Sequence, residues 1–171
     1  MHARAVVLVA LTTLTGIVTA CNSDGTTAPV SNIVTFRTAS MNGANESPVN
    51  ATTGSGTFTA TLDTVTKVFT YALTFTGLSA VVNNGHIHGP AAPGVNSGAT
   101  INFNTLPGAT FSFGATAGTG TGTVVLSAAT AITATMSGDS LRKLLMAGLT
   151  YVNIHTTAFP GGEIRGQVLR Q

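Results

Sequence analysis

Histidine, the side chain most often used to bind transition metals, is concentrated in two short segments of this sequence. The first contains His86 and His88, separated by one residue. In an extended backbone, residues two apart project from the same face, so the two rings can share one ligand. The second contains His155, which follows Tyr151 and Asn153 at the same spacing. If these segments are neighbouring strands, three imidazoles converge.

Three converging imidazoles form a donor set suited to copper or zinc, because neutral imidazole binds Zn²⁺ and Cu²⁺ at about 2.0 Å. We expect Glu163 to add a carboxylate oxygen to the ligands His86, His88 and His155. A pair of histidines two apart is by itself a common pattern. The same groups also fit a structural cluster with no cofactor, in which ring N–H groups bind backbone carbonyls or the Glu163 carboxylate. The residues alone leave both interpretations open.

Three other polar residues are expected to stabilise the fold as a structural polar cluster. Glu46 lies in a segment of turn-forming residues, where its carboxylate can accept hydrogen bonds from backbone N–H groups. Asn153 shares its predicted strand face with His155. Arg165 comes two residues after Glu163, so the pair can interact directly or with neighbours across the sheet. In a chain with only 7% charged residues, we assign these groups structural roles.

The elements that position these residues are predicted to be strands of an all-β, antiparallel, Greek-key-like β-sandwich. From residue 33 onward, apolar and polar residues alternate with period two, and Gly and Asn clusters interrupt them about every ten residues. Threonine and valine, which are stiff at χ1, favour this conformation. Segments 57–62 and 67–75 are close enough to predict a hairpin. The predicted strands are 33–38, 57–62, 67–75, 85–89, 100–103, 110–113, 120–126, 131–135, 149–156 and 163–169.

One segment has a helical period instead. Three leucines recur at i, i+3 and i+4, Ser137 and Asp139 precede or begin the run as candidate N-caps, and Gly148 is placed to end it. This pattern predicts one short helix near 139–147. We expect the helix to close one end of the sandwich.

The N-terminal residues have the anatomy of an export signal, with Arg4 followed by an apolar stretch and small residues. Cys21, the only cysteine, ends the tetrapeptide Val18-Thr19-Ala20-Cys21, which resembles the lipobox of bacterial lipoproteins. The resemblance implies cleavage before Cys21 and acylation of that residue. An ordinary secretory leader with a chance cysteine is the alternative. The apolar stretch is too short for a membrane-spanning helix.

The chain is therefore predicted to have three parts: a lipoprotein signal peptide at 1–20, a flexible tether at 21–32 that begins at lipidated Cys21, and one β-sandwich domain at 33–171. This organisation places the protein in the cell envelope, on the periplasmic or cell-surface side of a bacterial membrane. The membrane is then one partner, through the lipid, and a protein or cell-surface ligand is another.

Composition and missing motifs exclude several functions. Seven Lys and Arg residues against five Asp and Glu residues form no clustered basic face, so nucleic acid is not an expected partner. The sequence has no GxSxG motif, no P-loop and no cysteine nucleophile, and it has no close pair of carboxylates on one predicted strand. Hydrolytic catalysis therefore has no support in the sequence.

Several blocks of the sequence together resemble the chordin-type, or CHRD, domain family, over about residues 36–167. In animals this family forms part of the extracellular antagonist chordin, and in bacteria it occurs in secreted or anchored proteins of poorly defined role. The resemblance implies an exported, β-rich module and names no substrate. The blocks are 41–48 (MNGANESP), 54–56 (GSG), 86–91 (HIHGPA), 151–156 (YVNIHT) and 159–167 (FPGGEIRGQ).

The strand with His86 and His88 is also similar to the copper strand of copper/zinc superoxide dismutases, so the sandwich is expected to be immunoglobulin-like or superoxide-dismutase-like. A dismutase of that type needs more imidazoles, including one that bridges two metals. Only three histidines remain in this chain once the predicted leader is removed. We therefore expect a non-enzymatic binding or interaction module with one possible copper or zinc site. The alternatives are a metal-dependent redox enzyme that uses the same site and a purely structural cell-surface domain.

Overall fold

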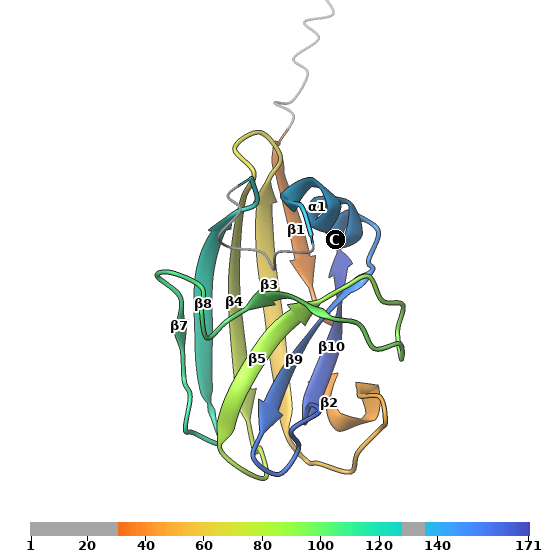
Figure 1. Cartoon of the computed structure of the whole chain (residues 1–171), viewed down its shortest axis with the longest axis vertical. Helices are drawn as coiled ribbons and strands as arrows, with labels where there is room; N and C mark the ends of the chain where they lie inside the picture. Colours follow the sequence, from red (N-terminus) through yellow and green to blue (C-terminus); the bar gives the residue numbers. More distant parts are fainter. Residues whose placement is uncertain (1–30, 128–135) are drawn as a thin grey trace, which may run out of the picture. The chain divides into compact units, whose positions relative to one another are not determined.

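The computed structural model describes residues 31–127 and 136–171, and these ranges form an antiparallel β-sandwich with one short α-helix (Figure 1). The prediction of an all-β fold is confirmed. The predicted signal peptide at 1–20, Cys21 and nearly all of the predicted tether lie outside the described residues. So does the predicted strand at 131–135.

The strands match the predicted segments closely, because the alternation of apolar and polar residues has the strand period wherever one face is buried. Strand β2 and the 3-10 turn η1 (Gly43–Asn45) were not predicted, since elements this short show no period. The strands are β1 (Ile33–Arg37), β2 (Met41–Asn42), β3 (Ser55–Asp63), β4 (Val68–Thr76), β5 (Val82–His88), β6 (Ala99–Asn102), β7 (Thr110–Phe111), β8 (Gly118–Val125), β9 (Thr150–Thr156) and β10 (Ile164–Arg170).

The strands form two layers, one with β5, β9 and β10 and the other with β1, β3, β4 and β8 (Figure 1). Hydrogen bonding connects them in the order β6-β5-β9-β10-β1-β3-β4-β8-β7, while β2 pairs with β10 and β3. The predicted hairpin is present as β3 and β4. Strand β9 lies between β10, which follows it in sequence, and β5, which is separated from it in sequence by β6, β7 and β8. This non-sequential order agrees with the Greek-key-like expectation.

The core lies between the two layers. In β4, the alternate residues Phe69, Tyr71, Leu73 and Phe75 are buried, and the residues between them are exposed. In β9, Val152 and Ile154 face the same core. Because neighbouring residues of a strand point to opposite faces, Tyr151, Asn153 and His155 lie on the outer face of the layer.

The helix α1 (Gly138–Met146) confirms the predicted helix, and it covers the end of the sandwich drawn at the top of Figure 1. Ser137 is its N-cap and accepts a hydrogen bond from the backbone N–H of Ser140. Leu141 and Leu145 are fully buried in the core. Gly148, with φ of 68°, takes the left-handed conformation that follows the helix end.

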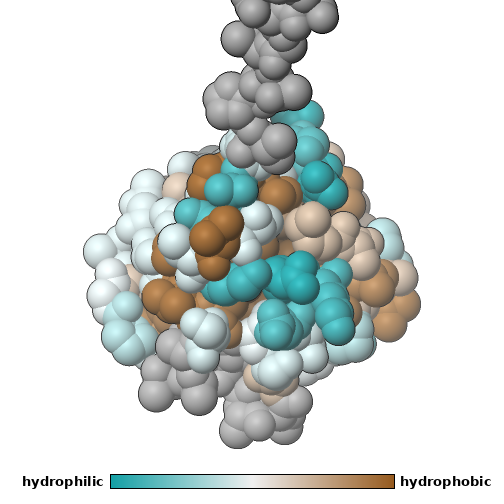
Figure 2. All heavy atoms as spheres, turned by 90° about the horizontal axis from the view of Figure 1, so that it is seen from above, coloured by the Kyte–Doolittle hydropathy of each residue, from teal (hydrophilic) through white to brown (hydrophobic). Residues whose placement is uncertain are grey.

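Viewed from above, the domain exposes hydrophobic residues in scattered groups between hydrophilic and near-neutral ones (Figure 2). Such scattered groups are ordinary on a folded domain. Within residues 31–127 and 136–171, no helix is both long and apolar enough to cross a membrane.

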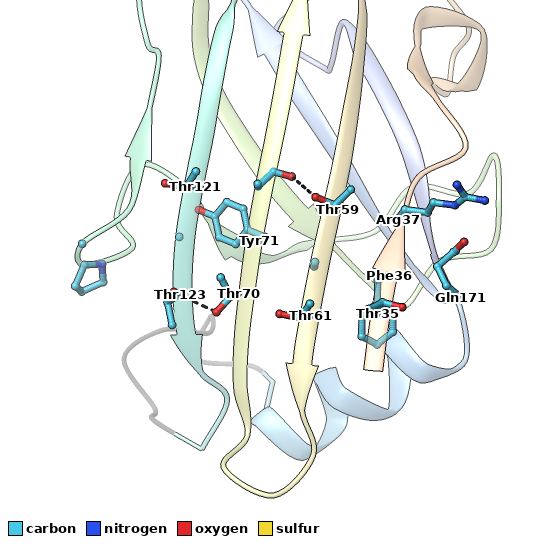
Figure 3. Close-up of a pocket in the computed structure, with 15 residues that line it drawn as sticks. Thr35, Phe36, Arg37, Thr59, Thr61, Thr70, Tyr71, Thr121, Thr123 and Gln171 are labelled. Atoms are coloured by element: carbon cyan, nitrogen blue, oxygen red, sulfur yellow. Dashed lines mark hydrogen bonds between the residues drawn. The ribbon is translucent and has the colours of Figure 1, made fainter. Parts of the chain in front are cut away.

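The outer face of β1, β3, β4 and β8 is a shallow concave surface lined mainly by threonines (Figure 3). Threonine hydroxyls on neighbouring strands form hydrogen bonds with one another; the Oγ1 atoms of Thr70 and Thr123, for example, are 3.3 Å apart. Arg37 is the one charged residue among those that line this surface, and the lining includes no histidine, carboxylate or cysteine. The three histidines lie on the other layer, in β5 and β9.

Candidate metal site

The three imidazoles meet on the outer face of the layer formed by β5, β9 and β10. Strands β5 and β9 are antiparallel neighbours, and their register places His86 opposite Asn153 and His88 opposite Tyr151. One ring nitrogen from each of His86, His88 and His155 lies within 4.8 Å of the others. The closest pair, His86 Nδ1 and His155 Nε2, is 3.1 Å apart. The convergence predicted from the strand pattern is therefore present.

The segment between β5 and β6 covers this face and shields the rings from solvent. Arg165 in β10 donates to the carbonyl of Val95 at 2.8 Å and to Oδ1 of Asn96 at 3.1 Å. Gln167 donates to the carbonyl of Ala91 at 2.8 Å. These bonds fasten the covering segment to the sheet. The exposed fractions of the first two imidazoles are accordingly small, 9% for His86 and 8% for His88.

Backbone carbonyls fix the orientation of two of the rings. Nδ1 of His88 lies 2.9 Å from the Ser97 carbonyl oxygen, and Nδ1 of His155 lies 2.8 Å from that of Pro160. A carbonyl only accepts hydrogen bonds, so each Nδ1 carries the proton and each Nε2 has a free lone pair when the ring is neutral. Both Nε2 atoms point toward Oδ1 of Asn153, at 2.9 Å and 3.0 Å.

Burial keeps the rings in the neutral form that binds metal. It lowers the pKa of His86 to about 4, and the neighbouring His155 and His88 add to this effect because their positive charges would repel. Burial also lowers the pKa of His88 and of His155, although hydrogen bonds to backbone carbonyls oppose it. At neutral pH each of the three imidazoles is therefore neutral and has one nitrogen lone pair that can bind a metal.

The Tyr151 ring stacks on the His88 ring, and the Arg165 guanidinium in turn stacks on the Tyr151 ring. The rings of His88 and Tyr151 are parallel, with centroids 4.6 Å apart and an angle of 2° between the planes. On the other side of the Tyr151 ring, Cζ of Arg165 lies 3.4 Å from the centroid, in cation–π geometry. The sequence placed Tyr151 on this face by alternation, but no role was assigned to it. The stack limits rotation of the His88 ring.

The predicted polar cluster of Glu46, Asn153 and Arg165 is brought together directly beside the histidines. Arg165 and Asn153 are cross-strand partners, and Glu46 is 5% exposed. Burial raises the pKa of Glu46 to about 7, opposed by the Arg165 charge and by hydrogen bonding from the Ser47 backbone and the Asn153 side chain. Besides the loop role predicted for it, Glu46 therefore contacts Asn153, whose side chain faces the imidazoles.

Glu163, predicted as a metal ligand, lies elsewhere. Its carboxylate accepts hydrogen bonds from the hydroxyls of Thr52 and Thr156, both at 2.6 Å, and from the backbone N–H of Ser79 at 2.7 Å. Thr156 follows His155 directly in β9 and so faces the opposite side of the sheet. The group of metal-ligating atoms consists of the three histidines without this carboxylate. The prediction of Glu163 as a ligand is therefore corrected.

The reason is local backbone geometry at the start of β10. Alternation would place Glu163 on the face of Arg165, but the strand begins only at Ile164. Gly162, with φ of 129°, turns the chain just before it. The strand period therefore does not extend back to Glu163, whose side chain points to the threonines at this end of the sandwich.

Comparison with known protein families identifies one family for this domain. A family model described as the CHRD domain matches residues 37–168. The match includes every residue of the histidine cluster and of the polar cluster beside it. No curated protein and no solved structure matches the chain.

Proposed function

This chain belongs to the CHRD-domain family, and we propose that it is an extracytoplasmic binding module that holds one copper or zinc ion through His86, His88 and His155. The module is anchored to a bacterial membrane by lipid on Cys21.

The observation that carries the proposal is the convergence of three buried, neutral imidazoles, two of which donate their other ring N–H to a backbone carbonyl. Histidines that bind metal almost always make such an outer hydrogen bond, because it fixes the tautomer and the ring orientation. Nitrogen ligands lie about 2.0–2.1 Å from zinc, so small rotations bring nitrogens at this spacing to one ion. Imidazole donors without carboxylates favour copper and zinc over calcium or magnesium.

Metal titration of the full chain, purified without a histidine tag, tests the proposal. We expect one Zn²⁺ or Cu²⁺ ion per chain by calorimetry and elemental analysis. Because the ion binds only the folded state, 100-fold excess over Kd should stabilise the protein by about 2.7 kcal/mol in thermal unfolding. Ca²⁺ and Mg²⁺ serve as controls and should leave the melting temperature unchanged. If neither Zn²⁺ nor Cu²⁺ binds with one-to-one stoichiometry, the proposal is wrong.

The lipid anchor is supported by the tetrapeptide Val18-Thr19-Ala20-Cys21 and by the single occurrence of cysteine. In a bacterial host, we expect the wild type in the membrane fraction, with an acylated N-terminal cysteine in mass spectrometry. Cys21→Ala should release the protein from that fraction, because no acyl chain can then be attached. Ser23→Ala, two residues further along, is the matched control and should stay membrane-bound. A wild type without acyl mass would contradict the anchor.

A further inference from the structure

We infer that the Oδ1 atom of Asn153 is a fourth protein donor to the metal and that Glu46 holds the Asn153 amide in the donating orientation. The site then has a closed set of three imidazole nitrogens and one amide oxygen for a divalent cation. This inference rests on the proposed function and specifies its ligand set.

Three hydrogen-bond acceptors face one another beside Asn153. Asn153 Oδ1 lies 2.9 Å from His88 Nε2 and 3.0 Å from His155 Nε2. The proton of each ring is on Nδ1, which donates to a backbone carbonyl, so each Nε2 presents a lone pair to the amide oxygen. Such an arrangement is repulsive unless a proton or a cation lies between the acceptors. A cation that accepts all the lone pairs satisfies them together.

Neighbouring donors stand at the spacing of one four-coordinate ion, whereas the three ring nitrogens together span up to 4.8 Å and must draw closer by ring rotation when the ion binds. With bonds of about 2.0–2.1 Å, adjacent donors lie about 2.9 Å apart in a square arrangement and about 3.3 Å apart in a tetrahedron. The three distances that link the four donors are 2.9 Å, 3.0 Å and 3.1 Å, running from His88 to Asn153, from Asn153 to His155 and from His155 to His86. Asn153 thus stands at a ligand distance from its neighbours, although it was assigned only a structural role from the sequence.

Glu46 fixes which end of the Asn153 amide faces the imidazoles. A Cβ atom on Gly162 would meet both Glu46 Oε1 and, at 2.7 Å, Asn153 Nδ2, so the carboxylate lies on the nitrogen side of the amide. Rotating the amide by 180° would turn its oxygen toward this carboxylate, which is unfavourable.

A closed set of protein donors has a consequence for function. Structural metal sites are closed, whereas catalytic sites keep one position for water or substrate. With Asn153 in the fourth position, the site holds a metal without offering a position for a reactant. This distinguishes a binding module from the redox enzyme considered as its alternative.

The test compares two substitutions of nearly equal volume in the full chain. Asn153→Leu removes the donor, and we expect Zn²⁺ affinity to fall by about 10- to 100-fold in a chelator competition. Asn153→Asp keeps an oxygen donor and should bind at least as tightly as the wild type. With Cu²⁺ bound, azide should give a charge-transfer absorption band with Asn153→Leu, whose fourth position is open, and none with the wild type. Asn32→Leu, at an exposed position just before β1, is the control and should behave as the wild type.

The outcomes separate this inference from the proposed function. If the wild type binds metal and Asn153→Leu binds it equally well without an azide band, the fourth-donor inference is overturned and the three-histidine site remains. If Asn153→Leu and Asn153→Asp lose affinity equally, Asn153 acts only in packing, which also overturns the inference. Circular dichroism confirms folding of each variant, and Asn153→Ala replaces Asn153→Leu if that variant fails to fold. Failure of the wild type to bind metal rejects the proposed function itself.

Discussion

Replacing His155 with alanine is expected to weaken metal binding by at least about 100-fold, beyond the usual effect of losing an outer-shell partner. Nε2 of His155 lies 3.1 Å from His86 Nδ1 and 3.0 Å from Asn153 Oδ1, so it stands between the other donors. Without the His155 ring, the donors His86 and Asn153 lose the neighbour that lies between them. Chelator competition with Zn²⁺ and Cu²⁺ measures the change.

This variant should remain folded, which makes the result interpretable. His155 is only partly buried, and its Nδ1 bonds to the carbonyl of Pro160 in a surface turn. We therefore expect the metal-free variant to lose no more than about 1 kcal/mol of unfolding free energy. Thr121→Ala, on the opposite layer, is the control for substitution of a polar strand residue. Metal affinity equal to that of the wild type would show that His155 is not a ligand.

Replacing Glu163 with alanine should lower the free energy of unfolding by about 3 kcal/mol, because three donors lose their acceptor in a buried place. The donors are the hydroxyls of Thr52 and Thr156 and the backbone N–H of Ser79. Glu163→Gln keeps a carbonyl oxygen that can accept from two of them, so its loss should be smaller. Urea denaturation at neutral pH measures both. A Glu163→Ala variant as stable as the wild type would contradict this role.

The same carboxylate predicts how stability changes with pH. Burial by itself would raise the pKa of Glu163, but the hydrogen bonds from Thr156, Thr52 and Ser79 outweigh it and lower the pKa below the ordinary value of 4.5. A group whose pKa is lowered by folding stabilises the protein above its unfolded pKa and loses that contribution as the pH falls through its folded pKa. The wild type should therefore lose stability below about pH 4.5, and Glu163→Gln should lose less over the same range. Parallel slopes for the two proteins would contradict this assignment.

The Glu163 network and the proposed metal site lie at the two faces of β9. Thr156 faces the Glu163 carboxylate, and its neighbour His155 faces the imidazoles. A substitution of Glu163 is therefore expected to act on folding stability, and a substitution of His155 on metal affinity. This separation is what allows the two predictions to be tested independently.

Local sequence patterns predicted most of the strands, the helix and the faces on which the candidate ligands lie. Alternation is a local property, so the burial of Val152 and Ile154 could be inferred from β9 alone, and with it the outward direction of His155. The spacing of His86 and His88 likewise placed both rings on one face. The cap at Ser137 and the glycine after α1 marked the helix for the same reason, because both act within one turn.

Only the tertiary structure decided what surrounds the three rings. The pairing of β5 with β9 joins segments far apart in the chain, and no local period specifies such a neighbour. The same holds for Glu46, which reaches Asn153 from a loop, and for the carbonyls of Ser97 and Pro160 that set the ring tautomers. Glu163 was placed wrongly because a single turn at Gly162 ended the alternation on which the prediction depended. Periodicity fixes the direction of a side chain within a strand, and contacts between distant segments fix what that side chain meets.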